Sequence, residues 1–274
     1  MSVRQREKAV CFRSLHYRPG TFVIPNPWDA ASARVLAGLG FEALATSSAA
    51  SAAVIGKRDG ALTRDEALQH ARAIVEATDL PVSADLEKGF GDAPETVAET
   101  VRMAADAGLV GCTIEDSTRN PERPLYDFGL AVERIAAAAE AARALPFSFM
   151  LTARAHAFMY ANPSLDETIR RLQKFEEVGA EVLFAPGLPD ITIVRAVCEA
   201  ISKPFNFMVG IKGKSFSLAE LSEAGVKRIS LATSLYRAAM SGLLEAAREV
   251  RDRGEFGFVD RCATTTELNE IMGI

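Results

Sequence analysis

The chain has 274 residues, of which 49% are hydrophobic and 24% are charged, proportions that are usual for a soluble globular protein. It is long enough for two average domains or for one large barrel. Its formal net charge of −5 argues against nucleic acid or an anionic membrane as a partner, because either would require a basic face.

Two further features exclude other classes of protein. No apolar run reaches the roughly 20 residues needed to span a bilayer, and the first residues carry charges but no apolar signal-peptide core. The four cysteines are widely spaced and form no C-x-x-C pair, which disfavours structural zinc and a disulfide framework. The sequence therefore predicts a cytoplasmic protein with reduced thiols.

Short apolar segments recur along the chain, separated by stretches with helical patterns. Each segment is rich in apolar or β-branched residues and only a few residues long, which is typical of strands buried on both faces. The predicted strands cover residues 21–26, 42–48, 80–87, 110–116, 147–154, 181–186, 205–210 and 228–233.

The intervening stretches carry start signals for helices. Thr63 and Glu66 form a capping box, Pro94 suits a first helical turn, and Ser164 with Glu167 marks another start. Strands that alternate with helices imply parallel βαβ units, and eight of them predict a (β/α)8 TIM barrel. An open doubly wound sheet is the alternative, but its G-x-G-x-x-G fingerprint is absent after the first strand.

No linker, low-complexity tract or second-domain boundary is visible in the chain. We therefore expect residues 1–274 to form a single domain, with about residues 235–274 as a C-terminal helical extension. The apolar stripe over residues 234–250 is typical of a helix that buries one face.

Two acidic residues end the third predicted strand, in the segment SADLEKGFGD. Asp85 and Glu87 are two residues apart, so on a strand they would point to the same side. Like charges held together repel unless a cation or a proton lies between them. A solvated strand end is the simplest explanation of such a pair. The ends of the other strands decide between this explanation and a functional site.

The neighbouring predicted strands also end in polar side chains. Active sites of (β/α)8 barrels lie at the C-terminal ends of the strands, so these side chains should surround one mouth. Scattered surface charge would not collect at the same end of successive strands, which favours a functional site. The residues are Glu115 and Asp116 at the end of the fourth strand, Arg154 at the end of the fifth, and Ser47 and Ser48 at the end of the second, which is followed by a loop that holds Asp59.

Acidic oxygen ligands without clustered His or Cys suit a hard cation. We expect Mg2+, with Mn2+ as an alternative, because Mg2+ takes one or two carboxylates and keeps positions for water and substrate. The metal would polarise a substrate oxygen and stabilise an enolate. Arg154 would clamp a substrate carboxylate or form a structural ion pair with one of the acids, and the two roles are compatible.

Four segments, LATSSAASAAVIGKRDG, SADLEKGFGD, TIEDS and TARAHAF, resemble in order and spacing the isocitrate lyase/phosphoenolpyruvate mutase superfamily. The likeness extends from NPWDAASARVL through SLYRAAM, nearly the whole chain. It implies a Mg2+-dependent barrel that makes or breaks C–C or P–C bonds next to a 2-oxo acid. It also implies a homodimer or homotetramer in which the last helix is exchanged between subunits.

The resemblance implies a metal site built from acids. Asp85 matches the acid that binds the metal most directly, and Glu87 and Glu115 match acids that hold it through water. Asp59 matches the loop acid near the metal. Asp59 and Glu115, together with Arg154, are the catalytic residues that the resemblance implies.

The resemblance also implies a substrate site. Ser47, Ser48 and Ala49 match positions whose hydroxyl and backbone N–H groups hold the oxo-carboxylate of the substrate. Arg154 matches the arginine that grips the carboxylate and the developing negative charge. Asn206, on the seventh predicted strand, is expected to face the same site.

The loops around the site depart from the family pattern. Lyases of this group carry a K-[KR]-C-G-H segment after the fourth strand, whose cysteine handles a proton. This chain reads DSTRNPERPLYDF there, so it lacks that cysteine and offers Arg119 and Arg123 on a lid. His156 replaces a polar or acidic residue, and APG at 185–187 stands where relatives have Glu or His. Cleavage of isocitrate or methylisocitrate through the thiol is therefore disfavoured.

Several other candidates are interpreted as structural. Cys112 precedes the site on the fourth strand and is expected to pack in the barrel. His16 and His70 lie on segments predicted to be peripheral and are expected to be inert. No lysine lies within a predicted barrel strand, which disfavours a Schiff-base aldolase.

The leading hypothesis is an enzyme that acts on a small 2-oxo acid through a Mg2+-bound enolate. Candidate reactions are oxaloacetate-type decarboxylation, a phosphonopyruvate reaction, or retro-aldol (Claisen) cleavage of an isocitrate-like 2-hydroxy polycarboxylate. The alternative is a catalytically silent barrel that binds a dicarboxylate as a sensor or scaffold, which the altered lid and the APG segment favour.

Overall fold

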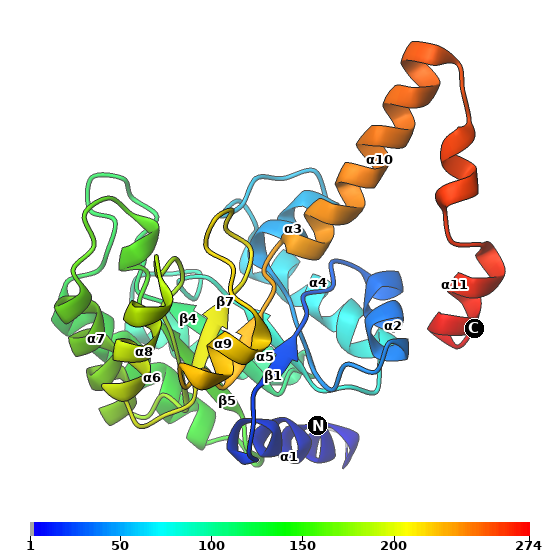
Figure 1. The fold of residues 1–274 in the computed structure, drawn as a ribbon. Helices are drawn as coiled ribbons and strands as arrows, with labels where there is room; N and C mark the ends of the chain where they lie inside the picture. Colours follow the sequence, from blue (N-terminus) through cyan, green and yellow to red (C-terminus); the bar gives the residue numbers. More distant parts are fainter. Residues whose placement is uncertain (1–2) are drawn as a thin grey trace.

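The structure is a computed structural model that describes residues 3–274 and is built around eight parallel strands (Figure 1). Each strand pairs with its neighbours in the order β1-β8-β7-β6-β5-β4-β3-β2. The strands are β1 (Phe22–Ile24), β2 (Leu44–Ala45), β3 (Val82–Asp85), β4 (Gly111–Glu115), β5 (Met150–Arg154), β6 (Val182–Phe184), β7 (Phe205–Met208) and β8 (Arg228–Ser230).

The two ends of this sheet meet and nearly close it into a barrel. The backbone N–H of Ala45 donates to the carbonyl of Pro25 at 3.1 Å, just beyond β1. The side-chain amide of Asn26 donates to the carbonyl of Thr46, also at 3.1 Å. Contacts between the two end strands leave little free sheet edge. The predicted (β/α)8 TIM barrel is confirmed.

Helices connect successive strands and cover the outside of the barrel (Figure 1). No helix of residues 3–274 is long and apolar enough to cross a membrane. The helices are α1 (Val3–Tyr17), α2 (Ala30–Gly38), α3 (Ser48–Val54), α4 (Arg64–Ala77), α5 (Pro94–Asp106), α6 (Phe128–Arg143), α7 (Leu165–Glu177), α8 (Ile191–Glu199), α9 (Leu218–Glu223), α10 (Ser234–Arg253) and α11 (Thr265–Met272), with short 3-10 turns η1 (Ala157–Met159) and η2 (Gly257–Arg261).

The predicted helix starts are confirmed. The Thr63 hydroxyl accepts from the N–H of Glu66, whose carboxylate accepts from the N–H of Thr63, so α4 begins with a full capping box. The hydroxyl of Ser164 accepts from the N–H of Glu167 at the start of α7. The reciprocal bond is not made there, because the Glu167 carboxylate pairs with Arg171 instead.

The first helix closes the N-terminal end of the barrel. Phe12 and Leu15 of α1 are buried in a cluster with Phe22 and Met150, which begin β1 and β5, and with Val110, which precedes β4. The apolar side of α1 therefore seals the bottom of the barrel, and the opposite end remains available for a site.

The last helices form an arm beside the barrel. Helix α10 projects away from the barrel, and the chain returns through η2 so that α11 lies beside α2 (Figure 1). The contact is close, because a Cβ added at Gly38 would lie 1.8 Å from the carbonyl oxygen of Ile271. In α10 the buried residue is Glu249, whereas Leu243 and Leu244 are at least half exposed. The division of residues 1–274 into a single domain with an extension from about 235 stays a prediction.

Candidate active site

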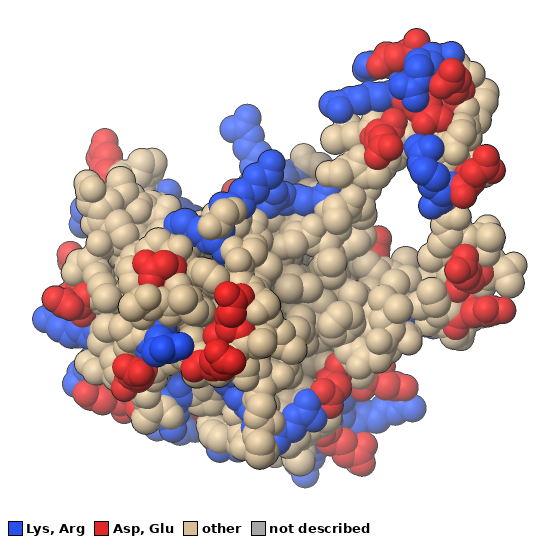
Figure 2. All heavy atoms as spheres, viewed as in Figure 1, with Lys and Arg blue, Asp and Glu red and all other residues tan. Residues whose placement is uncertain are grey.

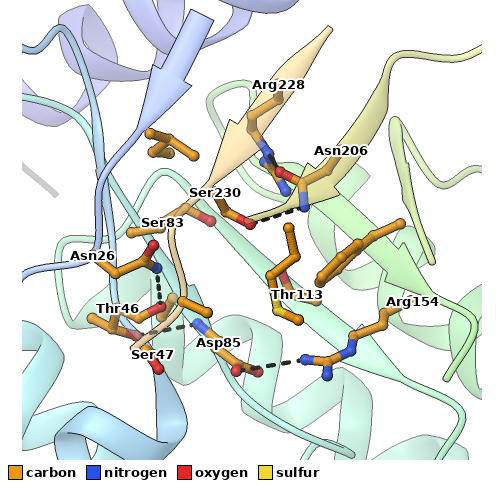
Figure 3. A pocket seen from close by; sticks show the side chains of 16 residues that line it. Asn26, Thr46, Ser47, Ser83, Asp85, Thr113, Arg154, Asn206, Arg228 and Ser230 are labelled. Carbon is orange, nitrogen blue, oxygen red and sulfur yellow. Dashed lines mark hydrogen bonds and ion pairs between the residues drawn. The ribbon is translucent and has the colours of Figure 1, made fainter. Parts of the chain in front are cut away.

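A small polar cavity opens at the C-terminal ends of the strands. Its volume is about 50 Å3, room for a few water-sized groups. Figure 3 shows Asp85 and Arg154 at one end of the cavity and Asn206, Ser230 and Arg228 at the other. The polar residues that line it are Asn26, Thr46, Ser47, Ser83, Asp85, Thr113, Arg154, Asn206, Arg228 and Ser230.

Asp85, the last residue of β3, points into this cavity. Its Oδ1 accepts from the backbone N–H of Glu87 at 3.1 Å, and its Oδ2 lies 3.5 Å from the backbone nitrogen of Ser48. The N–H of Asp85 donates to the Thr46 hydroxyl at 3.1 Å. These bonds fix the direction of the carboxylate, with Arg154 Nη1 at 3.8 Å from Oδ2.

Glu87 reaches the site by a different route from the one predicted. Strand β3 ends at Asp85, so the alternation of strand side chains does not place Glu87. Its φ of +51° is in the left-handed region, which costs a residue with a Cβ on the order of 1 kcal/mol. Burial raises the pKa of this carboxyl to about 7, although Arg119 opposes the shift. Glu87 is therefore a strained, partly protonated acid at neutral pH.

Glu115 at the end of β4 is the most enclosed of the acids. Its side chain is fully buried, with Arg154 Nη1 and His156 Nδ1 at 3.4 and 3.3 Å from Oε2. Burial alone would raise its pKa, but Arg154, His156 and Arg119 outweigh burial and lower the pKa to about 2. Glu115 is therefore ionised.

Arg154 stands between the acids and the rest of the cavity. Its guanidinium lies over the ring of Phe184, 4.9 Å from the ring centroid. Its buried Nε has no hydrogen-bond partner in the described part of the chain, and neither has Glu115 Oε2. Buried polar atoms without partners are unusual and point to groups that bind a ligand.

The guanidinium of Arg119 binds three of the predicted metal ligands. Its Nε lies 3.1 Å from Glu115, its Nη1 3.2 Å from Asp59 and its Nη2 3.3 Å from Glu87. Sequence reasoning placed Arg119 on the lid and missed this contact, because the positive φ of 62° that turns the side chain inward is not visible in the pattern. Arg119 thus supplies positive charge in the middle of the acids.

The acids fit a hard cation in chemistry, since all the predicted ligands offer oxygen atoms and Glu115 Oε2 lacks a hydrogen bond. Their present arrangement is not that of a metal cage. Within residues 3–274 no group of three or more His, Cys, Asp or Glu side chains is placed to hold a metal ion. The insertion of Arg119 accounts for this, because it separates Asp59, Glu87 and Glu115. The metal prediction is thus supported by donor type and not by geometry.

The predicted serine site is only partly assembled. Strand β2 ends at Ala45, three residues earlier than expected, and Ser48 is already the first residue of α3. Ser47 lines the cavity, whereas Ser48 contributes its backbone N–H toward Asp85. Ala49 lies further along α3 and is not among the residues that line the cavity. Its predicted role in binding substrate has no support in the geometry.

Asp116, predicted at the mouth, has structural partners, and Cys112 is packed inside the barrel. Asp116 is buried, accepts from the N–H of His156 at 2.8 Å and pairs with Arg171 at 3.1 Å, away from the cavity. The Cys112 side chain is fully buried, and burial raises the pKa of its thiol. Cys112 is therefore packing, as predicted, and Asp116 anchors the start of the loop after β5.

The end of the cavity formed by β7 and β8 contains groups that sequence reasoning missed. Asn206 lines the cavity, and its Oδ1 accepts from Nε of Arg228 at 2.7 Å. Arg228 also contacts His16 of α1, which is buried beneath the barrel and not peripheral as predicted. Burial, together with Arg228, lowers the pKa of His16 to about 3. A signal was present, since Arg228 is a charged residue at the start of an otherwise apolar strand.

The comparisons with known proteins agree with this geometry. The family model for phosphoenolpyruvate phosphomutase matches residues 12–251. The chain therefore belongs to this family, within the phosphoenolpyruvate mutase/isocitrate lyase superfamily, and is an enzyme of C–C lyase or phosphonomutase type.

Individual relatives cover nearly the whole chain. The 2,3-dimethylmalate lyase of Eubacterium barkeri is 32% identical over 265 residues, covering 92% of this chain and 89% of the relative. A crystal structure from Burkholderia cenocepacia J2315, assigned only broadly as a lyase or mutase, is 49% identical with a TM-score of 0.96, covering 99% of this chain and 98% of the other. Oxaloacetate acetylhydrolase in complex with its product oxalate is 25% identical with a TM-score of 0.88, covering 97% and 94%.

Proposed function

We propose that this enzyme makes or breaks a C–C or P–C bond of a small 2-oxo acid through an enolate, with Mg2+ or Mn2+ as cofactor. The observation that carries the proposal is Arg154, which lines the cavity beside Asp85 and Glu115 and has a buried Nε without a partner in the described chain. A guanidinium held in this way, with donors to spare, suits a carboxylate.

Asp85, Glu87, Glu115 and Asp59 would hold the cation, which when bound favours negative charge on the oxo oxygen of the substrate. Arg154 would bind the carboxylate and stabilise the charge that develops beside it. Its position is fixed in advance by Phe184 beneath and by Glu115 alongside, so it needs little rearrangement. Asn206 and Ser47 would orient the substrate from the other walls of the cavity.

The substrate is proposed to be a small anion rather than a long polycarboxylate. A cavity of about 50 Å3 admits few atoms beyond the carboxylate and oxo groups unless the loop containing Arg119 opens. The loop from Ser117 to Tyr126 lacks a cysteine, so the thiol route to methylisocitrate cleavage stays disfavoured. Because the comparisons identify an enzyme family, we do not retain the alternative of a catalytically silent barrel.

The test is turnover of a panel of substrates, with and without Mg2+ or Mn2+. The panel contains oxaloacetate, phosphonopyruvate, 2,3-dimethylmalate and 2-methylisocitrate, and the Arg154→Ala variant serves as the blank. We expect metal-dependent turnover of at least one 2-oxo acid and none of 2-methylisocitrate. If the wild-type protein turns over none of the compounds faster than the blank does, the proposal is contradicted.

We also propose that the arm mediates a homodimer or homotetramer, with exchange of the last helix between subunits. The support is the composition of α10. Figure 2 shows charges of both signs gathered at the far end of the arm. Leu243 and Leu244, in the middle of α10, are exposed apolar residues. Light scattering after size exclusion should show a multimer, and Leu243→Asp with Leu244→Asp should dissociate it. A monomeric wild-type protein would contradict this.

A further inference from the structure

The barrel contains a buried arginine without a counter-ion. Arg228, the first residue of β8, is 4% exposed, and no carboxylate in residues 3–274 pairs with its guanidinium. Its three contacts are neutral: Asn206 Oδ1 at 2.7 Å, Thr152 Oγ1 at 3.1 Å and His16 Nε2 at 3.4 Å. Buried charges are normally paired, so an unpaired one requires an explanation.

His16 cannot supply the missing negative charge and is held neutral. Its Nδ1 lies 2.8 Å from the carbonyl oxygen of Phe12, so the ring proton belongs on Nδ1. Nε2 then offers a lone pair toward Arg228, which can only donate. The guanidinium is thus solvated by neutral acceptors on three sides, and its positive charge remains uncompensated within the fold. Burial lowers the pKa of Arg228 to about 9, which still leaves it charged at neutral pH.

The same contact fixes the orientation of Asn206. Because Arg228 Nε is a donor, the Asn206 atom that faces it must be the oxygen, and the amide nitrogen must lie on the other side. That nitrogen donates to Ser230 Oγ at 3.1 Å and has a second hydrogen to offer. Figure 3 shows Arg228, Asn206 and Ser230 together, across the cavity from Asp85 and Arg154.

We propose that Arg228 is a positioning and specificity residue: it turns the Asn206 amide into a donor toward the cavity, and its unpaired charge selects a ligand that is anionic at this end. With Arg154 at the opposite end, the cavity would prefer a ligand with two negative groups over an isostere with one. This inference rests on the proposed function, since it assumes that the cavity binds the small anion.

The probes are oxalate and oxamate, which have nearly the same shape but differ by one charge. Their affinities are measured by calorimetry at a fixed Mg2+ concentration. In Arg228→Met we expect oxalate to bind about thirtyfold or more weakly, in the range typical of a lost partner to a buried charge. Oxamate should weaken less, so the preference for oxalate over oxamate should fall at least about fivefold.

Two controls separate this role from a general loosening of the barrel. Thr152→Val removes the hydroxyl on the far side of Arg228 and keeps the Asn206 contact. The preference for oxalate over oxamate should therefore stay within about twofold of the wild-type value. Arg228→Lys keeps the charge and should restore part of the preference. A merely structural role predicts that both ligands weaken equally in Arg228→Met, with the preference unchanged, and that result would overturn the inference.

A second variant keeps the test decisive if Arg228→Met does not fold. Asn206→Asp gives Arg228 a counter-ion and replaces the donor by an acceptor at nearly constant shape. We expect the melting temperature to rise while oxalate affinity falls by at least about tenfold. Oxalate binding at wild-type affinity in Asn206→Asp would overturn the inference. If wild-type protein binds neither probe, the proposed function fails and this inference fails with it.

Discussion

The two sides of the barrel mouth are built from different kinds of side chain. Around β3, β4 and β5, three carboxylates and two guanidinium groups approach within 4 Å of one another, namely Asp85, Glu87, Glu115, Arg119 and Arg154. Strands β6, β7 and β8 instead present Phe184, Asn206 and Ser230, an aromatic ring, an amide and a hydroxyl. The positive charge on that side, Arg228, lies one layer deeper.

This difference separates two tasks. Charges on the acidic side are already paired, so adding a cation or an anion there changes which group pairs with which. On the side of β6, β7 and β8 the donors and acceptors are fixed by their neighbours, and we propose that a ligand there would be recognised by hydrogen bonds above the buried charge of Arg228. Variants on the acidic side should therefore change whether ligands bind, whereas variants on the side of β6, β7 and β8 should change which ligands bind.

The largest effect is expected for Arg154→Ala. Removing one partner of a buried charge pair costs about 2–5 kcal/mol, or roughly thirty- to several-thousand-fold in affinity for oxalate or pyruvate. Metal affinity should stay within about tenfold, because Arg154 is not a ligand. Calorimetry measures both, with the exposed lid residue Arg123→Ala as the matched control. If Arg154→Ala binds oxalate normally and Arg119→Ala does not, the residue that binds the substrate carboxylate is on the lid and is not Arg154.

Asp85→Ala should give the next largest effect. It removes the acid expected to bind the cation directly, and loss of a ligand should weaken Mg2+ or Mn2+ binding by at least about hundredfold. The measurement is a metal titration with oxalate present. Asp252→Ala, an exposed acid on α10, controls for the change in net charge. If Asp85→Ala binds metal as tightly as wild type, the acids at the mouth are not a metal site.

Arg119→Ala should act in the opposite direction. The guanidinium neutralises Asp59, Glu87 and Glu115, so a divalent cation must compete with it for the same oxygens. We expect Mn2+ affinity to rise by about tenfold in Arg119→Ala and to stay near wild type in Arg119→Lys. Weaker Mn2+ binding in Arg119→Ala would show that Arg119 assists the cation and does not compete with it.

The barrel and the acids of the site were predictable from sequence because both depend on local pattern. Eight buried segments predict the strands, and the capping residues predict the starts of helices between them. Active sites of such barrels lie at the C-terminal ends of the strands, which places Asp85, Glu115 and Arg154 at one mouth. Details that depend on backbone conformation were not predictable. Glu87 lies outside β3 with a left-handed φ, and Ser48 belongs to a helix.

Contacts between distant segments were also invisible in the sequence. Arg119 meets Asp59 across 60 residues of chain, and Arg228 meets His16 across 212. Nothing in the local pattern of His16 distinguishes a buried face of α1 from an exposed one, which is why it was predicted to be peripheral. Tertiary packing decides such partners, and periodicity reports only which face is apolar.

Glu87 should make the stability of the metal-free protein depend on pH. Burial raises its folded pKa to about 7, above the ordinary value of 4.5, so folding takes up a proton between these values. The stabilising effect of this proton is present at low pH and is lost as pH rises toward 7. Between pH 5 and 7.5, the free energy of unfolding of the wild type should fall by about 2 kcal/mol more than that of Glu87→Gln. Urea unfolding at both pH values measures this, and equal losses in the two proteins would contradict a raised pKa.

The smallest effect on activity is expected for the cysteines. Cys112 is fully buried within β4 and burial raises its pKa, while burial raises the pKa of Cys198 on α8 to about 12. Neither thiol is therefore ionised at neutral pH, and neither lies in the loop from Ser117 to Tyr126 where lyases carry the catalytic cysteine. Cys112→Ser and Cys198→Ser should keep turnover within about twofold.

These substitutions can still affect the fold, and the two effects must be separated. Burying a serine hydroxyl in place of Cys112 should cost about 1–3 kcal/mol of stability, because the site is apolar. Cys198→Ser, on a partly exposed helix, should cost less. Circular dichroism and thermal unfolding give stability, and kcat and KM for the substrate found in the panel give activity. A variant that stays folded but loses turnover would identify a catalytic thiol. Cys112 on β4 or Cys198 on α8 would then be the group that transfers a proton in the reaction.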